Sequence, residues 1–458
     1  MKMGKSSSLL LQGTPASTPV AEAKLDPTRR FLQLWPKIQA DLAGVQDVFS
    51  QLSPTEVVKE RLSKAMKTPA GFPLGKTIQA ILNRLPSAIE HMIVVPRLSL
   101  VAGSEVVTSR LIATLQQHYP NGGLCVIGPD EGFKRDANVV PAEVPLVAFN
   151  DIDASMDMPS RITALDRIMI EIRPRVVHSM NSVIAWMCFS KYARFYARDS
   201  KLYGNIYSDI RTADGAPAAY FFWKSLPETI DYMTGIMADN AAIIRRAKDC
   251  FGLLAHQMAR LHVTPTPVLG MSGNDPARDL QPYSLGRPKK TLWLSRIAPE
   301  KRLDVLQAIA PRCPERVFTI YGAQFGRPVD LSALAALPNV EIRGAFNDIS
   351  DVPAGEFDSY LFTTSAEGMP CTILEIAARG LPVIAPDIGG IGEFVDNETG
   401  WLISGPDAID EYVNALREIE REPAKAVSRS KNAQRRLLER HTWECYKRAI
   451  SNVPGYLA

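Results

Sequence analysis

Hydrophobic and polar residues alternate along the chain in blocks that predict strands followed by helices. Between Met92 and about Thr266, short apolar runs such as MIVVPRLSL, GLCVIGP, PLVAFND, RVVHSMN and KLYGNIYSDI predict buried strands, and amphipathic stretches between them predict helices. The same alternation starts again at Lys289 with KKTLWL, VFTIYGA and NVEIRG. Strands that alternate with helices form parallel sheets covered by helices on both faces. The pattern therefore predicts an α/β fold with two doubly wound lobes.

The rest of the chain departs from this alternation. The first residues are rich in Ser, Thr, Pro, Ala and Gly, which is typical of a disordered tail, and the next segment shows the 3.6-residue periodicity of helices. We expect these helices to pack on the first lobe, and a partner or membrane contact is the alternative. A polar stretch at 270–288, rich in Gly, Pro, Asp and Ser, predicts a hinge. The predicted parts are a tail at 1–24, a helical extension at 25–91, a first lobe at 92–275, a second lobe at 289–440 and a C-terminal helix at 441–458 that returns to the first lobe.

Composition excludes several classes of protein. A net charge of +3 in 458 residues gives no broad nucleic-acid surface, and no run of 18 apolar residues predicts a membrane span. The apolar run near the start is too short for a signal peptide. The six cysteines are widely spread without a C-x-x-C pair, which favours reduced thiols over disulfides or a zinc site. We expect a cytoplasmic protein, with peripheral membrane contact left open.

The most informative stretch runs from Leu361 to Leu402. It predicts a buried strand ending at Thr364, a loop with Glu367, and a helix over about 370–379 that Gly380 ends. Glycine lets a ligand approach the backbone closely, and first-turn amides have no partner within the helix, so an anion such as phosphate fits there. The residues of this predicted phosphate site are Gly368, Met369, Pro370, Cys371, Thr372 and Ile373.

Two acids flank that site. Glu367 precedes the helix and Glu375 lies eight residues later. Two carboxylates beside one anion repel each other unless each receives hydroxyl donors, and sugar hydroxyls supply such donors. One acid therefore suits a hexose and the other a ribose, with a diphosphate between them.

Two cations are predicted to meet the same diphosphate. Arg296 and Lys301 are five residues apart in the loop that follows the strand KKTLWL. Both side chains can converge on one anion while the next helix adds its dipole. Surface ion pairing is the alternative for these residues.

The wording EGMPCTILEIAARGLPVIA, followed by GGIGEFV and preceded by SRIAPEKRLD, resembles the donor-binding signature of family 4 retaining glycosyltransferases of the GT-B fold. The resemblance implies two Rossmann-like lobes. It implies that Glu367 contacts the donor sugar, Glu375 the ribose, and Arg296 and Lys301 the diphosphate. It also implies that Gly103 approaches the donor phosphate and that the backbone from Arg343 to Phe346, including Gly344, contacts the base. The closing helix with Trp443 is expected to serve packing.

The first lobe carries weaker signals for an acceptor site. His178 resembles the first His of the family's H-x-H, but Met180 stands where the second is usual. His178 and Asp209, both at strand ends, are candidates for the acceptor side, and a structural role is the alternative for each. Lys191, Arg194 and Arg198, with aromatic residues interleaved, predict either an anionic-membrane contact or a solvated face.

The resemblance implies a metal-independent glycosyltransferase that moves a sugar, with retention, from a UDP-, GDP- or ADP-sugar to a saccharide or lipid-linked acceptor, without a cofactor. Bacterial envelope polysaccharide or glycolipid synthesis is the expected setting. Catalytic roles fall on Glu367, Arg296 and Lys301. A GT-B epimerase of nucleotide sugars and a degenerate nucleotide-sugar-binding protein are the alternatives. A dinucleotide oxidoreductase is disfavoured because G-x-G-x-x-G is missing after the first strand.

Overall fold

A computed structural model describes most of the chain, namely residues 73–86, 88–99, 103–137, 139–207, 221–268, 276–346 and 349–457. The chain divides into Met1–Lys76 and Thr77–Ala458, and both sheets lie in the second unit. The predicted tail and most of the predicted helical extension lie outside the described residues. The end of that extension forms helix α3 (Pro73–Arg84), where the sequence KTIQAILNRL predicts a helix.

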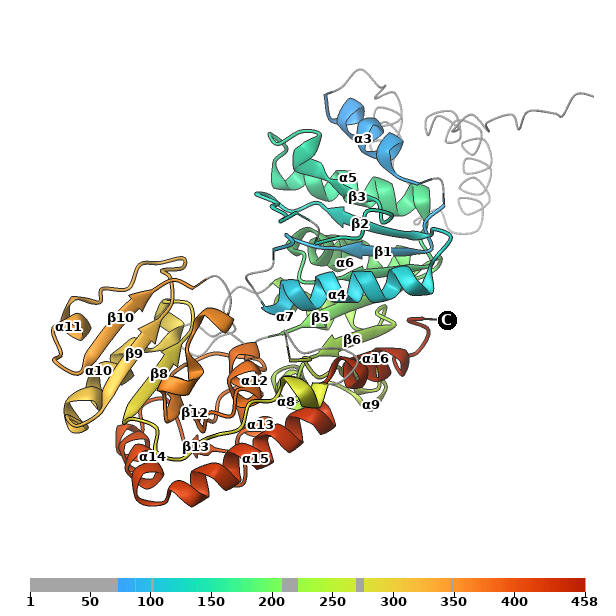
Figure 1. Ribbon diagram of the computed structural model, residues 1–458. Coiled ribbons are helices and arrows are strands. Elements are labelled where there is room, and N and C mark those ends of the chain that lie inside the picture. Colours follow the sequence, from blue (N-terminus) through green and yellow to red (C-terminus); the bar gives the residue numbers. More distant parts are fainter. Residues whose placement is uncertain are drawn as a thin grey trace, which may run out of the picture. The chain divides into compact units, whose positions relative to one another are not determined.

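The first sheet has seven parallel strands in the order β3-β2-β1-β4-β5-β6-β7 (Figure 1). Its central strands are buried along their whole length, so that they read as continuous apolar runs. The strands are β1 (His91–Val94), β2 (Leu124–Gly128), β3 (Leu146–Ala148), β4 (Val176–Ser179), β5 (Lys201–Ile206), β6 (Gly235–Ala238) and β7 (Leu261–Val263).

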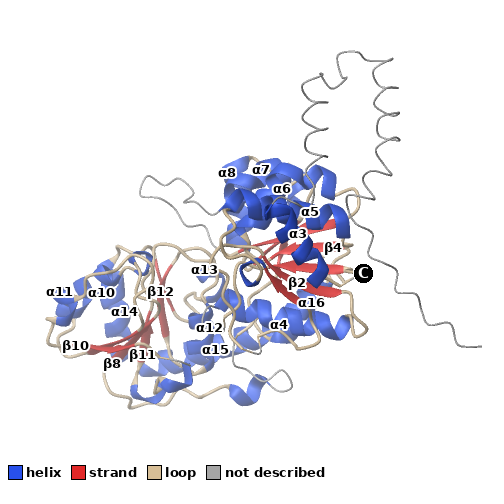
Figure 2. Ribbon diagram, turned by 90° about the horizontal axis from the view of Figure 1, so that it is seen from above, coloured by secondary structure: helices blue, strands red, loops and turns tan. Residues whose placement is uncertain are grey.

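Helices cover both faces of this sheet (Figure 2). Side-chain caps fix several of the helix starts. For example, Asn240 accepts the Ile243 N–H at the start of α8, and Gly252 ends that helix in the left-handed conformation with φ 59°. The helices of this part are α4 (Gly103–His118), α5 (Met158–Ile172), α6 (Val183–Tyr196), α7 (Phe221–Thr229), α8 (Ala241–Phe251) and α9 (Ala255–Met258), with the short 3-10 helix η2 (Phe149–Asp151).

The second sheet repeats the arrangement with six parallel strands in the order β10-β9-β8-β11-β12-β13. Both strand orders reverse direction beside their first strand, which is the doubly wound topology. The strands are β8 (Lys290–Leu294), β9 (Val317–Tyr321), β10 (Val340–Gly344), β11 (Ser359–Leu361), β12 (Val383–Pro386) and β13 (Trp401–Ile403). The two Rossmann-like lobes predicted from the sequence are confirmed.

The second lobe is covered by α10 (Leu303–Ile309), α11 (Ser332–Ala335), α12 (Cys371–Ala378), α13 (Ile391–Phe394), α14 (Ile409–Arg421) and α15 (Pro423–Arg440). Single-turn 3-10 helices lie between these elements. They are η3 (Pro276–Asp279), η4 (Pro299–Lys301), η5 (Ala310–Arg312), η6 (Ile349–Asp351) and η7 (Ala354–Glu356). Of the predicted hinge at 270–288, the described part begins at η3.

The last helix, α16 (Trp443–Ser451), belongs to the core of the first sheet. Tyr446, Ile450, Val453 and Tyr456 are buried in one cluster with Ile93 and other residues of β1, β2 and α4. Figure 1 shows α15 running along the second lobe and α16 lying at the first. The last described residues of the chain therefore pack in the core of the first lobe.

Two predicted strands are shorter than expected. The run MIVVPRLSL forms a strand only up to Val94 because Pro96 has no N–H for the ladder, and Leu98 makes one isolated bridge to Arg135. The strand predicted to end at Thr364 ends at Leu361. The residues after it leave the ladder because Thr363 and Thr364 bond the neighbouring loop instead.

Candidate functional site

Two loops meet at the point where the second sheet reverses its strand order. The first follows β8 and carries Arg296 and Lys301, and the second follows β11 and carries Glu367. Because β8 and β11 are neighbouring parallel strands, both loops leave the sheet at the same edge. Ligands of doubly wound sheets bind at this edge, so the local fold places three predicted site residues where a ligand is expected.

Hydroxyl groups tie the two loops together. The Thr363 hydroxyl donates to the Lys301 carbonyl at 2.7 Å and the Thr364 hydroxyl to the Glu300 carbonyl at 3.1 Å. The Ser365 N–H also donates to the Glu300 carbonyl, at 2.8 Å. Trp293 on β8 holds Thr363 in turn, because its indole N–H donates to that hydroxyl at 2.9 Å. The relative positions of Lys301 and Glu367 are therefore set by the backbone and do not depend only on their own side chains.

Lys301 and Glu367 form an ion pair within this framework. Their side chains are 7% and 14% exposed, and the Lys301 ammonium lies 5.3 Å above the ring centre of Phe362. Burial, and to a smaller extent the nearby Arg296, lower the pKa of Lys301, and Glu300 opposes them. The resulting pKa is about 7. A lysine with such a pKa binds its proton more tightly when an anion arrives. The pair is thus poised to receive a negatively charged ligand.

Arg296 is the exposed cation of the site. Its guanidinium carbon lies 4.4 Å from the ring centre of Phe325, a side chain that is itself 43% exposed. Among the described residues no carboxylate lies within ion-pair distance of Arg296. Stacking on Phe325 therefore orients the guanidinium while leaving its N–H donors available to a ligand.

The N-terminus of α12 supplies further donors. Pro370 is the N-cap and not a first-turn residue as predicted, and it offers no side-chain cap. The Ile373 N–H donates to the Pro370 carbonyl at 3.1 Å, so the predicted set of three available amides is reduced. In the described chain no oxygen accepts a hydrogen bond from the other two amides, those of Cys371 and Thr372, and the Cys371 N–H faces its own thiol. These two N–H groups remain suited to an anion.

Glu375 lies further along α12 and is half-buried. Its charge reaches other groups of the described chain. Burial raises the pKa of Tyr360 and of the Cys371 thiol, and Glu375 adds to both shifts. Burial lowers the pKa of Arg110, and Glu375 opposes that shift. Arg110 belongs to α4 of the first lobe and lies 6.0 Å from the ring centre of Trp443. Glu375 therefore faces the first lobe.

The structure places the predicted site glycines as follows. Gly368 is so closely packed that a Cβ atom there would lie 1.7 Å from the Tyr207 carbonyl oxygen. Gly344 ends β10 with φ 82°, and its carbonyl accepts the Gly322 N–H at 2.8 Å. Gly103 is the first residue of α4. Of these three glycines, Gly368 directly follows Glu367 in the sequence. Gly103 begins α4 and Gly344 ends β10.

The acceptor-side candidates have a different outcome. His178 is completely buried, the Tyr456 hydroxyl lies 2.6 Å from its Nδ1, and Asn205 Oδ1 contacts its Nε2. Burial lowers the pKa of this imidazole to about 4. In this arrangement both ring nitrogens are occupied by the chain, as the structural alternative implies. Asp209 lies outside the described residues.

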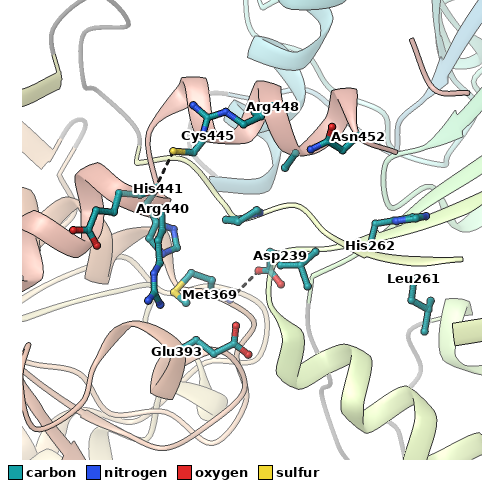
Figure 3. Close-up of a pocket in the computed structure, with 14 residues that line it drawn as sticks. Asp239, Leu261, His262, Met369, Glu393, Arg440, His441, Cys445, Arg448 and Asn452 are labelled. Carbon is teal, nitrogen blue, oxygen red and sulfur yellow. Dashed lines mark hydrogen bonds between the residues drawn. The ribbon is translucent and has the colours of Figure 1, made fainter. Parts of the chain in front are cut away.

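Two acids that the sequence analysis did not identify connect the lobes. Asp239 accepts the Met369 N–H at 2.8 Å, and Glu393 accepts the Ala241 and Ala242 N–H groups at 3.0 and 2.7 Å. Both acids line a groove of about 650 Å³ that also includes residues of β7, α15 and α16 (Figure 3). Asp239 directly follows the buried strand GIMA, and a polar residue at that position is the signal that identifies it.

The described residues contain neither a candidate metal site nor a membrane-spanning helix. No three His, Cys, Asp or Glu side chains in the described ranges gather as a set of metal ligands. Among the same residues, no helix has the length and apolar character needed to cross a membrane.

Comparison with known proteins gives a family for part of the chain. Residues 288–421 match the family model described as glycosyl transferases group 1. A sulfoquinovosyl transferase of Arabidopsis thaliana is 25% identical over 178 residues, which are 37% of this chain and 34% of that protein. A D-inositol 3-phosphate glycosyltransferase of Rhodococcus opacus is 29% identical over 187 residues, or 36% of this chain and 41% of that protein. The chain thus spans less than half the length of these curated relatives.

The fold is also found among solved structures. The structure of HepE from Anabaena in complex with UDP and glucose has a TM-score of 0.60 and 15% identity, and the match covers 79% of this chain and 98% of that chain. At this identity the likeness shows the fold. Residues 288–421 are therefore similar to glycosyl transferases group 1, within a chain that has the two-lobed GT-B fold.

Proposed function

We propose that this protein is a glycosyltransferase that moves a sugar from a nucleotide-diphosphate sugar to a saccharide or lipid-linked acceptor, with retention of the anomeric configuration. The observation that carries the proposal is the nearly buried pair of Lys301 and Glu367, with Arg296 and the α12 amides nearby. A cation and two amides suit a diphosphate, and a carboxylate suits the sugar hydroxyls beside it. The match of residues 288–421 to glycosyl transferases group 1 supports the same substrate class.

In the proposed reaction the bond between the anomeric carbon and the diphosphate oxygen breaks. A bond to the acceptor oxygen forms on the same face of the sugar, and the acceptor proton passes to the departing phosphate oxygen. The products are the glycosylated acceptor and a nucleoside diphosphate. Negative charge develops on the diphosphate in this step, and Lys301, Arg296 and the amides of Cys371 and Thr372 stabilise it. Glu367 orients the sugar, and we propose that protein cations meet this charge without a bound metal.

The setting that we propose is assembly of bacterial envelope polysaccharide or glycolipid. One similar protein has a name of this kind, a GDP-mannose-dependent phosphatidylinositol monomannoside mannosyltransferase of Mycolicibacterium smegmatis that is 27% identical over 188 residues.

Substitution of the two central residues tests the proposal. We expect E367A and K301A to bind nucleotide sugar weakly and to lose transfer by at least about a hundredfold, the range found for a lost transition-state donor. First, thermal shift with UDP-glucose, GDP-mannose and ADP-glucose identifies the base, because a bound ligand raises the unfolding temperature. Transfer is then measured with that donor. Near-normal transfer by both variants, with unfolding temperatures like that of the wild type, would exclude the assignment.

A nucleotide-sugar epimerase of the same fold differs in one requirement. An epimerase converts the donor without an acceptor, whereas a transferase releases nucleoside diphosphate faster when an acceptor is added. Product release measured with and without candidate saccharides therefore separates the two.

We also propose peripheral contact with an anionic membrane through one face of α6 and the residues after it. Phe195 is 57% exposed, and the Arg198 guanidinium lies 5.5 Å from its ring centre. Lys191 and Arg194 are exposed on the same helix. An exposed aromatic ring among cations suits the interface of an anionic bilayer. In vesicle co-sedimentation we expect binding to phosphatidylglycerol and not to phosphatidylcholine, and loss of binding in a variant with F195A and R194E. Equal sedimentation of wild type and variant would contradict this proposal.

A further inference from the structure

Residues 362–370, which join β11 to α12, are called the donor loop below. The peptide unit between Gly368 and Met369 in this loop is hydrogen-bonded at both its carbonyl and its N–H. The Gly368 carbonyl accepts the Gly390 N–H at 2.9 Å, and the Met369 N–H donates to Asp239 Oδ2 at 2.8 Å. Glu367 comes directly before this peptide, and the amides of Cys371 and Thr372 come directly after Pro370. The orientation of the peptide therefore sets the direction of the acid and of the amides together.

The group that holds the N–H end comes from the other lobe. Asp239 follows β6 of the first sheet and is only 4% exposed. Its second oxygen accepts the Asn240 side-chain N–H at 2.6 Å, so in the described chain its partners are two neutral amides and not a cation. Figure 3 shows Asp239 bonded to Met369 among the residues that line the groove. A buried carboxylate without a cation is costly, and such groups occur mainly where they serve function.

Packing leaves little freedom for the loop to find another arrangement. A Cβ atom on Gly368 would overlap the Tyr207 carbonyl, and one on Gly390 would lie 2.6 Å from Asn240 Cβ. Gly368 of the donor loop and Gly390 before α13 therefore both pack closely against the first lobe, at Tyr207 and Asn240.

We propose that Asp239 is a positioning residue of the donor site, acting across the two lobes through the Met369 N–H to orient Glu367 and the start of α12. This inference rests on the proposed function. It implies that the donor site of the second lobe is complete only when the first lobe supplies this carboxylate.

The charge of Asp239 supports the proposal. Burial raises its pKa to about 7, and the charge of Glu393 adds to that. The titratable and charged groups that face it or line the same groove are Tyr207, His262, Cys371, Glu393, Glu439, Arg440, His441, Cys445 and Arg448. Burial raises the pKa of Tyr207 and Cys371 and lowers that of His262 and His441, the latter to about 4. Of the groups of this set whose pKa is shifted, Asp239 is the one that changes charge near neutrality. Below its pKa it is neutral and a weaker acceptor, so the advantage in donor affinity of the wild type over D239N shrinks as the pH drops from 8 to 6.

The test compares D239N with E393Q by calorimetric titration of UDP-glucose, GDP-mannose and ADP-glucose. Each variant removes one carboxylate that joins the lobes, buried in the case of Asp239 and half-buried in the case of Glu393, but only Asp239 bonds the donor loop. We expect D239N to raise the Kd of the preferred donor about tenfold, the value of one charge-assisted hydrogen bond, and E393Q to change it less than threefold. We also expect the ratio of the Kd of D239N to that of the wild type to fall between pH 8 and pH 6, and the corresponding ratio for E393Q to stay constant.

Thermal unfolding completes the comparison. Because the folded protein raises the pKa of Asp239, its ionised form destabilises the fold above the pKa of an unfolded aspartate, and D239N is expected to unfold at the same temperature as the wild type or higher at pH 8. A purely structural role predicts the opposite. D239S, whose shorter hydroxyl does not reach Met369, serves the same test should D239N fail to fold. Equal donor affinity of D239N and wild type, or equal losses in D239N and E393Q, would overturn the inference. If the wild type binds none of the three donors, the proposed function fails as well.

Discussion

At the scale of single residues, the site holds the charges of Lys301, Arg296 and Glu367, and the described chain pairs only Lys301 and Glu367 with each other. Lys301 is 7% exposed, in contact with one carboxylate, and close to a second cation, Arg296. Arg296 is oriented by an aromatic ring and not by an acid. Desolvation makes the ammonium of Lys301 expensive in the absence of ligand, and an arriving diphosphate removes that cost. The free site therefore stores part of the free energy with which it binds an anion.

The pKa of Lys301 gives the first prediction at this scale. Since the pKa is about 7 in the free protein, the side chain is mostly neutral at pH 9 and must take up a proton when the diphosphate binds. The Kd of the preferred donor is expected to rise with pH above about 8, where Asp239 is already ionised, by up to about tenfold per unit until the pKa of the bound state is reached. Calorimetry in buffers of different ionisation enthalpy measures the proton uptake directly.

K301R is the matched control, because arginine stays protonated throughout this range. Its Kd is expected to be higher than that of the wild type but independent of pH between 8 and 9, where Asp239 is already ionised. Donor binding by the wild type without proton uptake at pH 8 would contradict the assignment of Lys301 to the diphosphate.

At the scale of elements, the decisive feature is the loop between β11 and α12. It is bonded to the loop after β8 by two threonine hydroxyls and to the first lobe by Asp239. Gly368 allows this arrangement, because any side chain there would meet the Tyr207 carbonyl. The loop is thus built for close contact on both sides.

G368A tests this packing. The added methyl group is expected to force the loop away from Tyr207, to weaken donor binding by at least about tenfold and to lower the unfolding temperature by a few degrees, as overpacking of about 1–3 kcal/mol does. Titration and thermal unfolding measure the two effects. G355A is the control, because a Cβ atom at Gly355 meets nothing within 4 Å. If G368A binds donor as well as G355A does, the close contact has no functional role.

The elements also show what the sequence could predict. The doubly wound fold, α12, and the two loops with Arg296, Lys301 and Glu367 follow from local apolar runs, glycines and spacing. The short strands β6 and β7 were not identified, because runs of three or four apolar residues are ambiguous. The bond from Asp239 to Met369 joins residues 130 positions apart, and no local pattern records such a pair. The buried state of His178 likewise depends on Tyr456, at the far end of the chain.

At the scale of the whole molecule, the chain leaves the first sheet, builds the second and returns through α15 and α16. The return is not superficial, since Tyr456 is completely buried against His91, His178 and Tyr203. The Tyr203 hydroxyl also donates to the Pro454 carbonyl at 2.6 Å. The stability of the first lobe therefore depends on residues that follow the second lobe in sequence.

A pair of substitutions at Tyr456 measures this dependence. Y456A removes a buried ring and is expected to lower the free energy of unfolding by about 3–5 kcal/mol, while Y456F loses only the hydrogen bond to His178 and is expected to lower it by about 1 kcal/mol. Chemical denaturation followed by tryptophan fluorescence reports both. Equal and small effects of the two variants would mean that the C-terminal segment is not part of the core.

The return of α16 has a consequence for how the protein is made. While the ribosome is still translating the second sheet, the face of the first sheet that α16 will cover is open, with apolar side chains of β1 and α4 exposed to water. Folding of the first lobe thus reaches completion only after residues 443–457 have left the exit tunnel. Prematurely terminated chains keep this apolar surface exposed to water. We expect chaperones to bind them, or proteases to degrade them, before they can bind donor or acceptor.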